Sequence, residues 1–79
     1  MKSRVQLEGM AAADAKRVGD ITELLVFDGQ YVARIQASGP MGDSLANFMR
    51  GHHIIVDGEL SSDAKGLFVV ARSLRAGQR

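Results

Sequence analysis

The 79-residue sequence contains no cysteine, so it can form neither a disulfide framework nor a metal site built on thiolates. It has no segment long and apolar enough to span a bilayer, and its first ten residues lack the unbroken apolar run of a secretion signal. We therefore expect a cytoplasmic protein with no membrane partner. A chain of this length buries roughly 60% of its unfolded surface. We expect one domain over residues 1–79, with residues 75–79 as a frayed tail.

The sequence also lacks the common catalytic motifs. It has no G-x-S-x-G, no H-E-x-x-H and no glycine-rich phosphate loop with a lysine. Asp57 and Glu59 lie two residues apart, but two strand carboxylates without a cleft or a partner base do not form an acid–base pair. His52 and His53 are adjacent, so in a strand they point to opposite faces, and no further ligand completes a metal site. We expect no enzymatic activity, no cofactor and no bound metal.

The charges almost cancel, but they are unevenly distributed. Ten basic and nine acidic residues give a net charge of +1. Residues 65–79 contain basic residues and no acidic one, whereas residues 18–33 contain acidic residues and no basic one. One interpretation is a local basic surface, which fits this pattern better than a uniformly cationic coat. The other is a polar tail that keeps the chain soluble.

The first predicted strand covers residues 5–11, where apolar or small side chains recur with a period of two. Gly9 lies within it and lets a strand bend sharply or another backbone approach closely. A first strand that pairs with two different neighbours would need this freedom. Residues 12–20 lose the alternation, so we expect a polar loop or an extension of the bent strand.

Residues 21–27 and 31–37 form two further strand-like runs, joined by Asp28 and Gly29. Asp-Gly between two such runs predicts a hairpin with a type I′ turn, whose positive φ angles these residues tolerate. In the second run, Arg34 lies on the face opposite the apolar residues, so it stands on an open sheet face.

A short helix is predicted after this hairpin. Gly39 and Pro40 end the strand, because proline cannot donate to a ladder. Asp43 or Ser44 can cap a helix. Its apolar residues recur at i, i+3 and i+4, at Leu45, Phe48 and Met49. Gly51 suits the left-handed residue that closes a helix. Two turns are not stable alone, so we expect this helix to plug the end of a small barrel.

Residues 53–60 and 67–74 are the last two predicted strands, and residues 61–66 form a loop between them. Asp57 and Gly58 resemble a turn, but only Glu59 and Leu60 would remain to form a partner strand. We therefore expect a bulge within one continuous strand.

The predicted order of elements is three strands, one helix and two strands. This is the order of the OB-fold, an all-β, five-stranded Greek-key barrel with one short helix between strands 3 and 4. An SH3-like barrel or an open α+β sheet can also hold five strands and a helix, but the position of the helix favours the OB-fold. Closure into a barrel removes most of the exposed sheet edge.

Three segments resemble the central part of bacterial single-stranded DNA-binding proteins: residues 31–36 (YVARIQ), 45–51 (LANFMRG) and 54–60 (IIVDGEL). Residues 4–9 (RVQLEG) are similar to the opening strand of that family. The sequence equally resembles primosomal replication protein N, a shorter relative and a dimeric OB protein. The resemblance implies an OB-fold, binding of single-stranded DNA, and a homodimer or higher homo-oligomer.

The sequence departs from that family in ways that bear on activity. It has no tryptophan and four aromatic residues in all, where the family stacks bases on several exposed aromatics. It has no room for long hairpins, and it ends in basic residues rather than in an acidic tail. The fold therefore carries over more strongly than the activity.

An OB groove binds a single strand through cations that follow the phosphates and through aromatic faces that stack on bases. The predicted binding residues are Lys16, Arg17, Tyr31, Arg34, Lys65 and Arg72. Each has a structural interpretation too, since a strand arginine or tyrosine can cover apolar surface with its stem or ring. Phe27 is a further stacking candidate, Phe48 is expected in the core, and Phe68 lies in either the groove or an interface. Stacking contributes about 1–3 kcal/mol per base, so few aromatics predict weak, salt-dependent binding.

The sequence thus predicts a non-enzymatic protein that binds single-stranded nucleic acid, DNA rather than RNA, with replication or plasmid or phage maintenance as its expected setting. The alternative is an OB module that associates with proteins as a subunit or adaptor. Outward-facing apolar residues favour this alternative, namely Met10, Leu25, Val32 and Val70.

Overall fold

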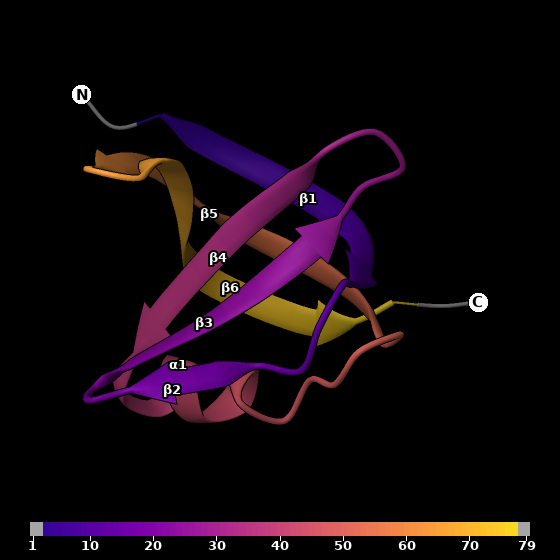
Figure 1. The fold of residues 1–79 in the computed structure, drawn as a ribbon, viewed down its shortest axis with the longest axis horizontal. Helices are drawn as coiled ribbons and strands as arrows, with labels where there is room; N and C mark the ends of the chain where they lie inside the picture. The colour runs from indigo at the N-terminus through magenta and orange to yellow at the C-terminus, as the bar shows by residue number, and fades with distance from the viewer. Residues whose placement is uncertain (1–2, 78–79) are drawn as a thin grey trace.

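A computed structural model describes residues 3–77 as one strongly curled sheet with a short helix at one end (Figure 1). Its elements are β1 (Arg4–Ala11), β2 (Lys16–Val18), β3 (Ile21–Phe27), β4 (Val32–Ser38), α1 (Gly39–Leu45), β5 (His53–Asp63) and β6 (Gly66–Ala76). The strand order is β1-β5-β6-β4-β3-β2, and β1 also pairs with β3, which closes the sheet into a barrel. The helix lies between the third and fourth of the five long strands, as the OB-fold requires.

The first strand bends at Gly9, as the sequence predicts. Residues 4–10 pair with β5, whereas Met10 and Ala11 pair with β3. A Cβ atom added at Gly9 would lie 2.3 Å from the carbonyl oxygen of Phe27. Only glycine allows the two backbones to approach this closely, so Gly9 is where the barrel closes.

The segment predicted as a polar loop or an extension of the bent strand contains a short separate strand, β2. All three residues of β2 are exposed, and they pair with the first residues of β3. Residues 12–15 connect β2 to the bent strand β1. The hydrophobic pattern misses β2 because both of its faces are solvated and no alternation results.

The β3–β4 hairpin is confirmed, but its predicted type I′ turn is wrong. Residues 28–31 form the loop, and Gly29 is the one loop residue with a positive φ, 106°. The Oδ1 atom of Asp28 accepts hydrogen bonds from the backbone N–H groups of Gln30 and Tyr31 at 2.9 and 2.8 Å. These bonds lower the pKa of Asp28, the bond from Tyr31 most. The side chain of Asp28 thus builds a wider turn than the Asp-Gly pair alone predicts.

The helix starts earlier than predicted. It begins at Gly39, and Pro40 lies in its first turn, where the missing N–H costs nothing and the fixed φ suits a helix. Asp43 and Ser44 therefore lie inside α1 and do not cap it. Leu45 is its last residue, so Phe48 follows the helix, although it still packs against the core as expected.

The helix plugs one end of the barrel, as the sequence predicts (Figure 1). It contacts β3, β4 and β6 and buries Gly42 and Leu45. The residues fully buried with Leu45 are Leu24, Val26, Ile35, Ile54, Val56 and Thr22. With seven residues α1 cannot cross a bilayer, and residues 3–77 include no helix with the length and apolar character to do so.

The last two strands are longer than predicted. Residues 61–63 belong to β5, Gly66 begins β6, and only residues 64 and 65 form the turn. The predicted bulge is confirmed by a shift of register between Asp57 and Gly58. Strand β6 continues to Ala76, so residues 75 and 76 of the expected tail lie in the sheet, and residues 78–79 lie outside the described part.

Candidate functional site

Three of the six residues that the sequence predicts for binding lie on or beside the outer face of β3 and β4, namely Lys16, Arg34 and Lys65. Residues directly opposite each other on paired strands share a face. Phe27 is opposite Val32, Leu25 is opposite Arg34, and Glu23 is opposite Gln36. At the Glu23 end, β2 extends the row, because Lys16 is opposite Glu23. This face, which we call the β3–β4 face, therefore runs from an apolar end to a charged end.

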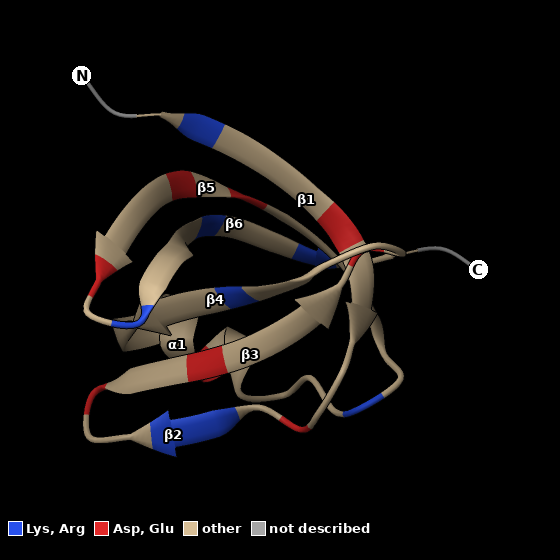
Figure 2. Cartoon of the chain, turned by 45° about the horizontal axis from the view of Figure 1, so that its top comes forward, with Lys and Arg blue, Asp and Glu red and all other residues tan. Residues whose placement is uncertain are grey.

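A groove of about 210 Å³ lies at the charged end of the β3–β4 face. Its lining residues are Lys16, Val18, Ile21, Glu23, Gln36 and Lys65. Lys16 comes from β2, and Lys65 comes from the turn between β5 and β6. Figure 2 shows these two basic segments at the same end of β3 and β4. Within residues 3–77, neither lysine side chain forms an ion pair with a carboxylate, so both ammonium groups remain available to a polyanion.

Arg34 also lies on the β3–β4 face, but its guanidinium is already bound. Its Nη2 donates to Asp63 Oδ1 at 2.8 Å and to the carbonyl of Gly66 at 3.1 Å, and its Nη1 lies 3.6 Å from Glu23 Oε2. The guanidinium also lies over the ring of Phe68, 5.2 Å from the centroid. Only 17% of the Arg34 side chain is exposed. Hydrogen bonding to Asp63 raises the pKa of Arg34, and the same bond lowers the pKa of Asp63.

Through these contacts Arg34 holds the turn between β5 and β6 in place. Asp63 Oδ1 also accepts from the backbone N–H of Lys65 at 2.9 Å. Arg34 therefore fixes the end of β5, and through Asp63 it fixes the backbone of Lys65 beside the groove. Gln36 of the groove wall donates to Glu23 at 3.0 Å, and Arg34 lies near the same carboxylate. Glu23 therefore links the groove to the contacts of Arg34.

The other two predicted arginines are also paired with carboxylates. Arg17 Nη1 lies 2.7 Å from Asp43 Oδ1, which joins β2 to α1. Arg72 donates from Nη2 and Nε to Glu59 Oε1, at 2.8 and 3.3 Å, which joins β6 to β5. Arg72 lines a separate groove on β1, β5 and β6, so the structure does not bring it to Lys16 and Lys65.

Of the aromatic candidates, Tyr31 and Phe27 lie away from the charged end, whereas Phe68 lies beside it. Tyr31 is 71% exposed and lies in the hairpin loop just before β4. Phe27 is 44% exposed and lines an apolar hollow of about 270 Å³ with Met10 and Val32. Phe68, which the sequence assigns to groove or interface, lies against Arg34 beside the charged end.

Sequence reasoning missed Glu23, Gln36 and Asp63 as parts of the site. Glu23 and Gln36 are detectable in hindsight, because the correct hairpin register places them opposite each other and beside Lys16. Asp63 is separated from Arg34 by 29 residues, and no local pattern indicates that the two meet. The binding roles of the six predicted residues remain predictions.

Comparison of the sequence with models of protein families gives no match, and comparison with curated proteins gives none either. The structure, however, is similar to several solved structures. A chain of the S. pombe Stn1–Ten1 complex superposes with a TM-score of 0.87 and 19% identity, covering 100% of this chain and 60% of that one. Asparaginyl-tRNA synthetase from Pyrococcus horikoshii superposes with a TM-score of 0.85 and 20% identity, and the match covers 98% of this chain and 20% of that one. The second single-stranded DNA-binding protein of Mycobacterium smegmatis superposes with a TM-score of 0.81 and 15% identity, and the match covers 96% of this chain and 89% of that one.

These similarities show the fold. At 15–20% identity the chain shares the architecture of all three proteins, which differ in what their names say they do. The chain spans 60% and 20% of the lengths of the first two. Residues 3–77 form an OB-fold of the kind found in single-stranded DNA-binding proteins.

Proposed function

We propose that this protein binds single-stranded nucleic acid on the β3–β4 face without catalysing a reaction, DNA being the preferred ligand. The observation that carries the proposal is a pair of lysines, Lys16 and Lys65, which line one groove and form no ion pair with a carboxylate of residues 3–77. Two cations separated by a groove suit the backbone of a single strand, which an OB-fold holds between the loops that flank its second and third strands.

The rest of the β3–β4 face supports this proposal. From the charged groove the face continues past Phe68 and Leu25 to Phe27 and Val32. Bases of a strand whose phosphates contact Lys16 and Lys65 can therefore lie on apolar and aromatic surface. Tyr31 stands at the far end, where its exposed ring can stack on one more base. A setting in replication or in plasmid or phage maintenance is part of the proposal.

The proposal predicts binding that depends strongly on salt. Each phosphate contact on a single strand contributes about 0.7 to the slope of log K against log salt. We expect Lys16→Ala and Lys65→Ala each to lower the slope by about 0.7, measured by fluorescence anisotropy with labelled oligothymidylate. Arg75→Ala is the matched control, because Arg75 is an exposed arginine of β6 outside this groove. Absence of binding by the unmodified protein at about 20 mM salt would exclude the function. Oligouridylate in the same assay decides between DNA and RNA.

A second candidate function is association with protein, through the apolar hollow at the other end of the face. Met10, Phe27 and Val32 are each about half exposed and lie together there. Adjacent apolar side chains of this size favour an interface, and the expected homodimer is one form of it. Light scattering tests this candidate: a dimer that Val32→Glu converts to a monomer, together with no affinity for oligonucleotides, would favour it over the first.

A further inference from the structure

The bulge between β5 and β6 places two consecutive side chains on the outside of the barrel. Asp57 pairs with Ser73 and Gly58 pairs with Ala71, so Arg72 is the extra residue and has no partner on β5. Arg72 and Ser73 are both exposed, whereas side chains along a regular strand alternate between its faces. Bulges often redirect a side chain in this way beside binding sites.

The backbone at the bulge is fixed by close packing. A Cβ atom added at Gly58 would lie 2.2 Å from the carbonyl oxygen of Val70. No larger residue fits there without moving β6. The position of Arg72 is therefore set by the fold.

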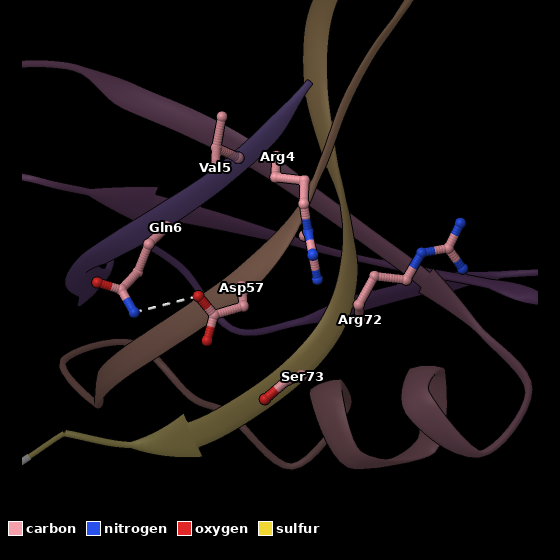
Figure 3. A pocket seen from close by; sticks show the side chains of 7 residues that line it. Arg4, Val5, Gln6, Asp57, Arg72 and Ser73 are labelled. Carbon is pink, nitrogen blue, oxygen red and sulfur yellow. Dashed lines mark hydrogen bonds between the residues drawn. The ribbon is translucent and has the colours of Figure 1, made fainter. Parts of the chain in front are cut away.

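The bulge lies beside a groove of about 550 Å³ between β1, β5 and β6 (Figure 3). Side chains of three strands line it, among them Arg4, Gln6, Asp57, Arg72 and Ser73. In Figure 3, Arg4 extends from β1 toward β6, and the guanidinium of Arg72 is directed away from Arg4. The guanidinium of Arg4 therefore lies within the groove, and the guanidinium of Arg72 lies across β6 from it.

The charges in this groove leave donors for an anion. Within residues 3–77 the guanidinium of Arg4 has no carboxylate partner. Asp57 accepts a hydrogen bond from the Gln6 amide at 3.1 Å. Arg72 binds Glu59 through Nε and Nη2, which leaves its Nη1 donors without a bond in the described part of the chain.

The groove also continues the β3–β4 face. Phe68, Val70 and Arg72 follow one another on the outer face of β6, and Phe68 contacts Arg34 on β4. Phe68 and Arg72 are separated by about 13 Å, given about 3.3 Å per strand residue. A single strand that leaves the lysine groove along Phe68 therefore meets Arg72 and then Arg4.

We propose that the groove between β1, β5 and β6 and the adjoining outer side of β6 form a second phosphate-binding site, in which Arg4 within the groove and Arg72 across β6 hold the backbone of the strand bound on the β3–β4 face. This inference rests on the proposed function and extends it. It assigns a binding role to Arg4, which carries no role in the lysine groove, and it predicts that the protein binds long strands better than short ones.

The test compares two oligothymidylates, one of about 5 and one of about 16 nucleotides, which lie near the two ends of the range of site sizes of single OB-folds. We expect Arg4→Ala to weaken binding of the long oligonucleotide and to lower its salt slope by about 0.7 between about 50 and 200 mM salt. Binding of the short oligonucleotide stays unchanged. Arg4→Lys keeps the positive charge and should keep most of the salt slope. Arg75→Ala should change neither the affinity nor the salt slope of either oligonucleotide. Thermal melting of each variant confirms that it is folded.

Each other result overturns the inference in an identifiable way. An unchanged slope for the long oligonucleotide in Arg4→Ala removes the second site and leaves the lysine groove intact. If Arg4→Ala weakens binding of the long and the short oligonucleotide equally, Arg4 contributes only to the overall electrostatic field of the protein and not to a second site. No binding of either oligonucleotide to the unmodified protein at about 20 mM salt overturns the proposed function together with this inference.

Discussion

The guanidinium of Arg34 and the carboxylate of Asp63 form a two-point ion pair, with Nη2–Oδ1 and Nη1–Oδ2 distances of 2.8 and 3.3 Å. Arg34 lies in the middle of β4 and Asp63 at the end of β5. Such paired hydrogen bonds fix direction as well as distance. The ion pair therefore determines where the β5–β6 turn lies relative to the β3–β4 face, and with it the position of Lys65.

The first prediction concerns this coupling. We expect Arg34→Ala to weaken oligonucleotide binding because Lys65 loses its fixed position. Losses at independent sites add to within about 0.5 kcal/mol. The double variant of Arg34 and Lys65 should therefore lose less binding free energy than the two single variants lose together. The difference should exceed that amount, as measured by anisotropy titration.

The control for this coupling is Arg17→Ala combined with Lys65→Ala. Arg17 is bound to Asp43 of α1 and not to Asp63, so those losses should add. Additive losses for Arg34 and Lys65 as well would show that Arg34 does not position Lys65.

The second prediction is a loss of stability in acid. Hydrogen bonds from Arg34, then from the backbone of Lys65, lower the pKa of Asp63, and backbone hydrogen bonds lower the pKa of Asp28. A carboxylate with a lowered pKa in the folded state stabilises the protein above its unfolded pKa, and this stabilisation is lost as the pH falls through the folded value. The urea midpoint should therefore fall as the pH drops below 3.8, the ordinary pKa of these groups.

Comparison of variants isolates the contribution of these two groups. Asp28→Asn combined with Asp63→Asn should show a smaller decline between pH 5 and lower pH than the unmodified protein, because neither carboxylate remains to be protonated. Asp20→Asn is the control, since Asp20 is an exposed carboxylate of the β2–β3 connection. Equal declines in all three proteins would contradict the prediction.

The third prediction concerns closure of the barrel. Gly9→Ala places a methyl group 2.3 Å from the carbonyl oxygen of Phe27, so β1 must separate from β3. Overpacking of this kind costs about 1–3 kcal/mol. Urea denaturation should show that loss, and Gln6→Ala, an exposed change on the same strand, should not. Unchanged stability in Gly9→Ala would mean that the strands separate at no cost.

The fourth prediction concerns Thr22, which is fully buried and whose hydroxyl has no hydrogen-bond partner within residues 3–77. An unsatisfied buried polar group costs about 1–3 kcal/mol. Thr22→Val replaces the hydroxyl by a methyl group and should raise the free energy of unfolding by about 1 kcal/mol. Thr22→Ser keeps the hydroxyl, loses the methyl group and should be less stable. Destabilisation by valine would show that the hydroxyl is bonded in solution.

Local signals were sufficient for much of the fold. Residues 21–27 became β3 with the predicted bounds, and the pattern around Gly58 indicated the bulge. Pro40 was misleading, because proline both ends strands and begins helices. The turn at Asp28 depends on its side chain, and the exposed strand β2 depends on pairing with β3. These two features have no hydrophobic signal of their own.

The site was less predictable than the fold for a similar reason. The sequence indicates which residues are basic, and the hairpin places Arg34 on the outer face. It does not indicate which acid lies opposite each base. The ion pairs of Arg17, Arg34 and Arg72 join residues 13 to 29 positions apart. Such pairing depends on how the strands and the helix pack in the folded chain, and it distinguishes Lys16 and Lys65 from these three arginines.

Strand β2 has a consequence for handling the protein. It is the last strand in the sheet order, so its outer side has unsatisfied backbone donors and acceptors within the described residues. Free edges of this type recruit strands from other molecules, and short length and positive charge oppose that recruitment. We therefore expect Lys16 and Arg17 to oppose fibrous self-assembly, and variants that neutralise them require a check for aggregation at each concentration used.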